Sequence, residues 1–213
     1  MKKQLSFSSV KLKDLLRLVP LDSTVDNSVF EKWFNYNYPL SEEENHYLDN
    51  LINANRQRLM MYSEEDLKVK FLGPLLNKVN FTFDKVTDWY ERPISCEING
   101  VWLSGITDYL VATGYEEPEL PFFFIQEFKP SYSNSQPSNQ LLAELLAAIH
   151  LTKETEILGA YIVGRLWTFM LLRKEAEGFH YYQSTGFNSI ELEDLIAIYK
   201  TLQRVKEDIK AKI

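Results

Sequence analysis

A glutamate and a lysine stand two residues apart near the end of an apolar run, Pro121-Phe-Phe-Phe-Ile-Gln-Glu127-Phe-Lys129-Pro130. The run is aromatic, short and closed by proline, which predicts a buried strand. Because side chains alternate along a strand, Glu127 and Lys129 are expected to project from one face. The other face is expected to carry the aromatic residues Phe122, Phe124 and Phe128. A charged pair on a core strand is costly unless it is partnered or binds a metal, so these two residues are the first candidates for chemistry.

A second carboxylate, Asp108, lies in a further predicted strand from Ile106 to Ala112, with Ile106, Leu110 and Ala112 expected on the same face. On adjacent strands, Asp108 and Glu127 can converge at one edge of a sheet. Their oxygens are ligands of the kind that Mg²⁺ takes while it keeps several waters. Such an ion would polarise a phosphodiester and lower the pKa of a bound water. Lys129 would then orient that water or offset the charge that develops on the phosphate.

The same spacing leaves structural alternatives open. Glu127 and Lys129 would form a salt bridge of small value if their strand end is exposed. Asp108 would cap a turn after Gly105. The chain holds two other acid-x-lysine tripeptides, Asp66–Lys68 and Asp208–Lys210. Both are expected on amphipathic helices, where solvated charges need no functional explanation.

The periodicity of the chain predicts the elements that position these residues. Ser63, followed by three acids, begins a helix with a core face from Leu67 to Val79 and a kink at Pro74. Asn99-Gly100 is typical of a type I′ hairpin turn. After the second charged strand, a helix is expected from Gln140 to about Leu151. Further strands are expected at 157–163, 167–172 and 180–183, followed by a helix capped by Asn188 and Glu191. This order indicates an α/β sandwich around a mixed sheet.

The first part of the chain has a different pattern. Residues 1–62 are predicted to form a helical N-terminal extension rather than part of a sheet, ahead of a main domain at 63–213. Ser41 and Glu44 have the spacing of a capping box at the start of a helix running toward Leu59. The aromatic residues from Phe30 to Tyr38 suit an interface with a protein partner, and packing on the main domain is the simpler alternative.

The composition limits the classes of function. The 213-residue chain is 45% hydrophobic and 14% aromatic, which is enough for a core and excludes a disordered protein. A formal net charge of −7 argues against a uniformly positive surface for nucleic acid, although a local basic groove is compatible. The single cysteine, Cys96, excludes an internal disulfide and is expected to be a packing residue. With neither a targeting segment nor an apolar run near the length of a bilayer span, we expect a cytoplasmic protein without membrane contact.

Several motifs stand in a specific order. Gly105-x-x-Asp108 lies nineteen residues before Glu127-x-Lys129-Pro130, within the predicted order helix, three strands, helix, strand. Over residues 63–165 this arrangement resembles the PD-(D/E)XK nuclease superfamily, with Thr107 where the family name has proline. The run from Glu64 to Leu76 is similar to the segment ahead of the nuclease core in the N-terminal domain of type I restriction enzyme R subunits.

The resemblance implies a restriction-endonuclease-like α/β/α sandwich with a central mixed sheet, and a Mg²⁺-dependent deoxyribonuclease in which Mn²⁺ can replace Mg²⁺. It implies that Asp108 and Glu127 are metal ligands and that Lys129 is the catalytic lysine. Glu64, or its neighbour Glu65, would be an accessory acid and a further ligand. DNA is the implied substrate, and a homodimer is one way to cut both strands.

Gln140 extends the resemblance to the helix after the charged strand. It is similar to a glutamine that RecB-like members carry there, and it is therefore a candidate catalytic residue. The tyrosine that those members carry four residues later is Glu144 in this chain.

A second class of function is a catalytically silent module that keeps the nuclease fold and serves as a subunit of a larger DNA-processing complex. The acidic composition favours this alternative, whereas the intact set of Asp108, Glu127 and Lys129 favours the enzyme. No phosphate-binding loop or dinucleotide fingerprint occurs in the sequence. The three histidines, His46, His150 and His180, lack metal-ligand spacing. The aromatic stretch from Trp167 to Tyr182 is expected to be core rather than a surface for stacking bases.

Overall fold

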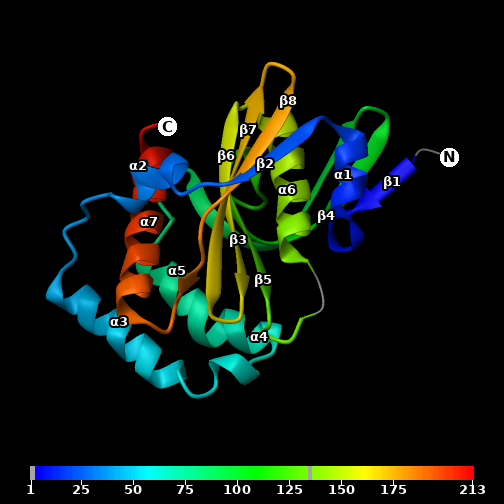
Figure 1. The fold of residues 1–213 in the computed structure, drawn as a ribbon. Helices are drawn as coiled ribbons and strands as arrows, with labels where there is room; N and C mark the ends of the chain where they lie inside the picture. The colour runs from blue at the N-terminus through cyan, green and yellow to red at the C-terminus, as the bar shows by residue number, and fades with distance from the viewer. Residues whose placement is uncertain (1–2, 134–135) are drawn as a thin grey trace.

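The computed structural model describes residues 3–133 and 136–213 and shows a mixed α/β fold built on one large sheet (Figure 1). The described strands are β1 (Lys3–Ser6), β2 (Leu21–Val25), β3 (Val86–Ile98), β4 (Val101–Thr113), β5 (Glu119–Lys129), β6 (Glu156–Val163), β7 (Leu166–Glu175), β8 (Gly178–Gln183) and β9 (Phe187–Asn188). The α-helices are α1 (Leu12–Leu18), α2 (Glu31–Phe34), α3 (Glu42–Asn55), α4 (Glu64–Leu67), α5 (Gly73–Val79), α6 (Pro137–Thr152) and α7 (Leu192–Lys210). Three 3₁₀ turns, η1 (Phe7–Ser9), η2 (Ser28–Phe30) and η3 (Leu59–Met61), and one π-helical turn, η4 (Lys68–Leu72), complete the set.

The sheet has the strand order β1-β4-β5-β6-β7-β8-β2, with β3 paired to β4 and β9 paired to β7. Three strand pairs are parallel, namely β1 with β4, β5 with β6, and β2 with β8. β3 pairs along nearly the whole of β4, so β1 and β5 share the other edge of β4. β1 takes residues 101–104 of that edge and β5 takes residues 109–113. Between them, residues 105–108 have no strand partner on this edge within the described part of the chain.

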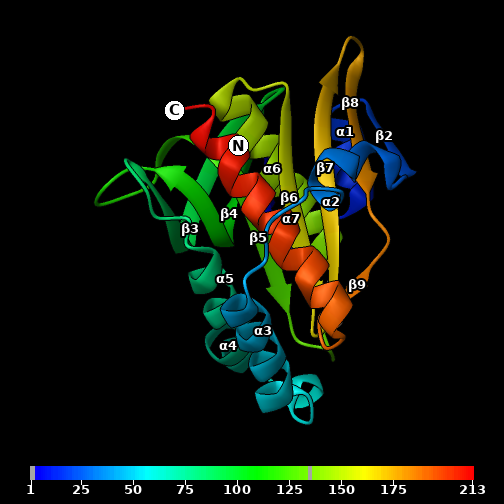
Figure 2. The same ribbon diagram turned by 90° about the vertical axis from the view of Figure 1, so that its left-hand side faces the viewer.

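Helices cover both faces of the sheet. On one face, α1 and α6 pack over a core that includes most of the apolar side chains of α6. On the other face, α2, α3, α5 and α7 cover a second core rich in aromatic residues (Figure 1). Figure 2 shows α3 lying alongside the α4–α5 segment, at the end of the sheet opposite to the β7–β8 hairpin. The sheet is therefore buried on both sides, which explains why β5 is an almost continuous apolar run.

Two irregularities shift the alternation of side chains. In β5, Val111 pairs with Phe124 and Ala112 pairs with Phe122, so one extra residue is accommodated as a β-bulge. Phe122 therefore lies in the α6-side core, whereas Phe124 lies in the opposite core. The expectation that these two rings share a face is wrong for this reason.

The second irregularity is in the β3–β4 pair. The ladder omits the pair Glu91–Asp108, and Glu91 has a left-handed backbone with φ 54°. Trp89 and Ile94 lie on either side of this point and both reach the α6-side core, so the alternation has moved by one residue. Ile106 is 59% exposed as a result, and the expectation that it shares a core face with Asp108 is wrong.

The N-terminal segment is not purely helical. β1 and β2 join the sheet far from one another, β1 beside β4 and β2 beside β8, which corrects the prediction of a helical extension over 1–62. Phe30 and Trp33 are buried and belong to the α7-side core, so the packing alternative holds for these aromatic residues. A domain boundary between residues 62 and 63 stays a prediction.

The helix starts agree with the capping patterns. The side chain of Ser41 accepts from the Glu44 N–H, and Ser63 does the same for Asp66, with the reciprocal contacts in place. The first of these helices ends at Asn55, earlier than expected. Pro74, which has no N–H to donate, follows the π-helical turn η4, in which the Gly73 N–H reaches back to the Lys68 carbonyl.

The hairpin prediction is confirmed, because Asn99 and Gly100 have φ of 49° and 78° and join β3 to β4. The strands after Lys129 agree with prediction to within a few residues, and α6 begins at Pro137, ahead of the expected start. The expected cap of α7 is wrong: Glu191 is the N-cap without a side-chain hydrogen bond, and the Asn188 N–H donates to the Asp194 carboxylate instead.

Candidate active site

Asp108 lies where β4 and β5 separate. Gln126 is the last residue of β5 that pairs with β4, and two residues further the Phe128 N–H donates to Asp108 Oδ2 at 2.7 Å. The carboxylate thus takes the place of a backbone carbonyl at the point where the ladder stops. Gly105 is part of β4 rather than a turn, and a Cβ there would lie 2.5 Å from the Phe7 ring. The alternative that Asp108 caps a turn is therefore wrong.

Glu127 and Lys129 lie on one face of β5, as the alternation predicts. Lys129 Nζ lies 2.5 Å from Glu127 Oε1, and it donates to the Phe128 carbonyl at 2.8 Å. Glu127 is completely buried and only 14% of the Lys129 side chain is exposed. The alternative of a surface salt bridge is therefore wrong, and both charges lie within the protein.

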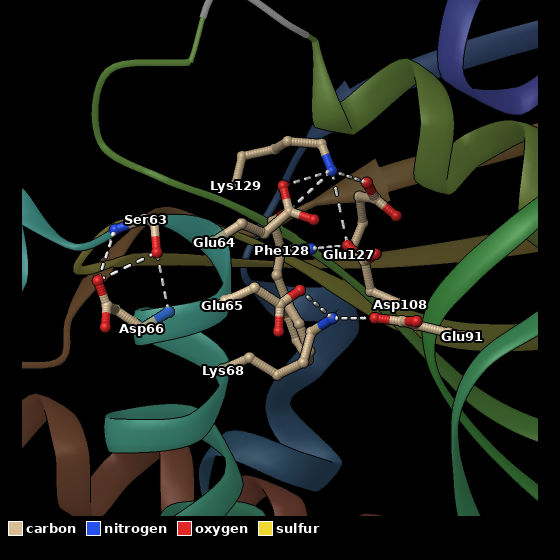
Figure 3. Close-up of polar contacts among 10 residues, drawn as sticks. All are labelled: Ser63, Glu64, Glu65, Asp66, Lys68, Glu91, Asp108, Glu127, Phe128 and Lys129. Carbon is tan, nitrogen blue, oxygen red and sulfur yellow. Dashed lines mark hydrogen bonds and ion pairs between the residues drawn. The ribbon is translucent and has the colours of Figure 1, made fainter.

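Three carboxylates surround the Lys129 ammonium (Figure 3). Besides Glu127, Asp108 Oδ2 lies 3.6 Å and Glu64 Oε2 3.4 Å from Nζ. Glu64 belongs to the first turn of α4, whose capping box fixes the direction of that turn. Glu65, the alternative accessory acid, turns away to a different lysine. Of the two neighbours, only Glu64 has an ion pair with Lys129.

Burial removes the titratable groups of this cluster from water and shifts their pKa values. Burial, together with the negative charge of Asp108, raises the pKa of Glu127 to about 8, and Lys129 offsets only part of that rise. Burial alone would lower the pKa of Lys129, but Glu127 and Asp108 outweigh it, so the pKa of this lysine lies above its ordinary value. Lys129 therefore carries a full positive charge at neutral pH.

Gln140 lies near the cluster without touching its acids. Its amide donates to Glu144 Oε1 at 3.3 Å, one turn further along α6. Glu144 is completely buried, and burial, with the charges of Glu127 and Asp108, raises its pKa well above the ordinary value. Glu144 is thus a site residue that the sequence analysis missed. Its signal was a lone carboxylate in the apolar run Leu-Leu-Ala-Glu144-Leu-Leu.

A second lysine was also missed. Lys68 was expected to be a solvated helix charge, yet it is 8% exposed. Its Nζ lies 2.6 Å from Glu91 and 3.6 Å from Glu65 (Figure 3). The sequence signal for its burial was its position directly after Leu67, which lies on the predicted core face of the helix.

The donor set of the cluster has the chemistry that Mg²⁺ requires. Both oxygens of Glu127 are buried without a hydrogen bond of good geometry in the described part of the chain, and Oε1 lies beside the Lys129 ammonium. Carboxylate oxygens are ligands that suit Mg²⁺, which also keeps several waters. No group of three or more His, Cys, Asp or Glu residues within 3–133 and 136–213 is arranged around a metal position as it stands. Instead, the Lys129 ammonium is the cation that Asp108, Glu127 and Glu64 share.

Two residues outside the cluster, Trp167 and Cys96, are packing residues, as the sequence predicts. Trp167 is fully buried in the α7-side core, which confirms that it does not stack bases. Cys96 is buried, and burial raises the pKa of its thiol to about 11, so it is a packing residue. None of the described helices combines the length and apolar character needed to cross a membrane.

Comparison of the chain with protein-family models and with curated proteins finds no match. The geometry and charge of the Asp108–Glu127–Lys129 cluster are therefore the features of this protein that point to a function.

Proposed function

We propose that this protein is a Mg²⁺-dependent deoxyribonuclease of the PD-(D/E)XK superfamily, with Mn²⁺ able to replace Mg²⁺. The observation that carries the proposal is the burial of Glu127 and Asp108 around one lysine, at the point where two strands separate. Buried carboxylates are costly to keep, and perturbed groups of this kind concentrate at functional sites.

The order of the elements supports the same class. α5 is followed by the antiparallel strands β3, β4 and β5, then by α6, and then by β6 parallel to β5. This is the order that a restriction-endonuclease-like α/β/α sandwich requires. Asp108 lies on the second strand of that core, and Glu127 and Lys129 lie on the third.

Each residue of the site has a role in the proposed reaction. Asp108, Glu127 and Glu64 would hold the cation, and a bound Mg²⁺ polarises the phosphodiester and lowers the pKa of a coordinated water. The Phe128 N–H fixes the direction of the Asp108 carboxylate. Lys129, which keeps its charge, would donate to a nonbridging phosphate oxygen and offset the negative charge that builds there. Gln140 would act through Glu144, which it contacts, as a positioning residue.

The second candidate is a silent module of a larger DNA-processing complex. It is favoured by the internal ion pairs of the site, since Lys129 already partners Glu64, Asp108 and Glu127. Either candidate, the nuclease or the silent module, would act as a homodimer or with a partner bound through residues 1–62. Such a partner would use residues other than Phe30 and Trp33, which are buried.

Turnover separates the two candidates. Supercoiled plasmid and single-stranded DNA are incubated with Mg²⁺ or Mn²⁺ and the wild type, Lys129→Met, Asp108→Asn, or the control Lys78→Met. Lys78 pairs with Glu43 on other elements and has no contact with the cluster. Metal-dependent cleavage that falls about 100-fold or more in both site variants, and is unchanged in the control, supports the nuclease.

Two other results have equally definite meanings. If the wild type is inert on both substrates with either metal, the silent module is the better description. If all variants cut at the rate of the wild type, the reaction does not occur at this site.

A further inference from the structure

Lys68 is a buried ammonium that the proposed reaction does not use. Its side chain is 10% exposed, and it lies in the π-helical turn that follows α4. Burial alone would lower the pKa of Lys68, but the neighbouring carboxylates of Glu91 and Asp108 outweigh it and raise the pKa above its ordinary value. A second fixed positive charge therefore lies within electrostatic range of Asp108, in addition to Lys129.

The backbone around Lys68 is unusual in two places, the π-turn and the β3–β4 irregularity at Glu91. The π-turn begins at Lys68 itself, and such turns occur often at functional sites. Glu91, which binds the Lys68 ammonium, has φ 54°, a conformation that a glutamate adopts only at a cost. Asp108 stands opposite Glu91 in the β3–β4 pair, where the ladder is interrupted. These deviations bring Lys68, Glu91 and Asp108 to one place.

The two carboxylates that bind Lys68 differ from those that bind Lys129. The side chain of Glu91 is 60% exposed and that of Glu65 is 73% exposed, so both can return to water. A carboxylate that leaves Lys68 regains its hydration in water, which offsets part of the cost of breaking the ion pair. Lys68, by contrast, is held in position by its buried surroundings. An anion from outside can therefore replace the carboxylates while the lysine stays in place.

We propose that Lys68 forms a phosphate-binding subsite beside the Asp108–Glu127–Lys129 cluster, in which a phosphodiester group of the bound DNA strand displaces Glu91 and Glu65. This inference rests on the proposed function, because it assigns the DNA contact of the same site. An ammonium binds phosphate as a compact point charge, and such charge-assisted hydrogen bonds are stronger than neutral ones. Glu91 and Glu65 occupy the subsite when no DNA is bound.

The test uses two substitutions that are expected to change the affinity for DNA in opposite directions. Binding of a fluorescent single-stranded oligonucleotide is measured by anisotropy with Ca²⁺, which takes oxygen ligands as Mg²⁺ does. Lys68→Met removes the proposed contact, and Glu91→Gln removes the anion that competes with the phosphate. The matched controls are Lys78→Met and Glu43→Gln, a lysine and a glutamate joined at 3.0 Å elsewhere. Lys78 lies ten residues beyond Lys68, about 15 Å further along the helical segment at 1.5 Å per residue.

The expected results follow from the loss of one phosphate contact. Lys68→Met weakens binding and lowers the slope of log affinity against log salt by about 0.7, the value for one phosphate of a single strand. Glu91→Gln strengthens binding by about two- to fivefold, the range of one exposed ion pair that no longer competes. Both control substitutions carry the same change of net charge as their counterparts and leave the slope unchanged.

Three outcomes overturn the subsite. If Lys68→Met and Glu91→Gln behave as their controls do while the wild type binds and cuts DNA, the subsite is wrong and the proposed function stands. If both substitutions weaken binding, Glu91 supports the fold or the DNA rather than competing with it. If the wild type neither binds nor cuts DNA, the subsite and the proposed function fail together.

Discussion

Replacement of Glu127 by glutamine should make the metal-free protein more stable, by an amount that grows with pH. In the unfolded chain this carboxyl loses its proton near 4.5, whereas in the folded protein burial and Asp108 raise its pKa to about 8. Between these values unfolding releases a proton, so Glu127 lowers the stability of the wild type as pH rises. The full shift corresponds to an increment of about 3.5 kcal/mol between pH 5 and pH 8, and relaxation around Lys129 reduces it to about 2 to 3 kcal/mol.

The measurement is urea unfolding of the wild type, Glu127→Gln and the exposed control Glu43→Gln, at pH 5 and pH 8 with a chelator present. The quantity of interest is the change with pH of the difference in unfolding free energy between variant and wild type. This comparison removes the fixed cost of placing a buried amide beside Lys129. If that difference is the same at both pH values, or if Glu127→Gln loses stability relative to wild type as pH rises, Glu127 is ionised in the folded protein and the reasoning is refuted.

Three further predictions concern packing and titration elsewhere. Gly105→Ala should destabilise the fold by about 1 to 3 kcal/mol, because its Cβ would lie 2.5 Å from the Phe7 ring, and an unchanged thermal midpoint would contradict this packing. Although burial raises the pKa of Glu44, hydrogen bonds from Ser41 and two tyrosines lower it to about 2, so stability should fall as pH falls from about 4.5 to 2. In urea titrations at pH 3 and 6, Glu44→Gln should reduce the loss of unfolding free energy between the two pH values by about 1 kcal/mol, a figure that is lowered because Glu44 is partly exposed. An equal loss in the variant and the wild type would refute this. Cys96, whose pKa burial raises to about 11, should react with a thiol reagent at pH 8 only after unfolding, and rapid labelling of the folded protein would contradict its burial.

Local signals predicted much of the fold. The capping box at Ser41, the helix start at Ser63 and the turn at Asn99-Gly100 depend on residues within a few positions of one another, and the structure has each of them. β1 and β2 were missed because they are short and pair with strands distant in the sequence. A strand of four or five residues has little periodicity of its own, so its partner decides its structure.

The residues of the site also divide into those that a local signal identified and those that only distant contacts decide. Glu127 and Lys129 were identified because a charged pair contradicts an apolar strand, and their shared face followed from the period of two. Lys68 and Glu144 were missed because a single charge on a helix is ordinarily solvated, whereas tertiary packing buries both of them. The interrupted pairing opposite Glu91 depends on a φ value that no periodicity encodes.

The pairing of β2 with β8 has a consequence for the synthesis of the chain. Residues 21–25 leave the ribosome well before their partner residues 179–183. Until β8 emerges, β2 has no strand partner, and its edge is unsatisfied. Such distant pairing slows folding and exposes strand edges during synthesis. The β2 edge of the sheet can therefore form only after β4, β5 and β6, which surround the cluster, have emerged.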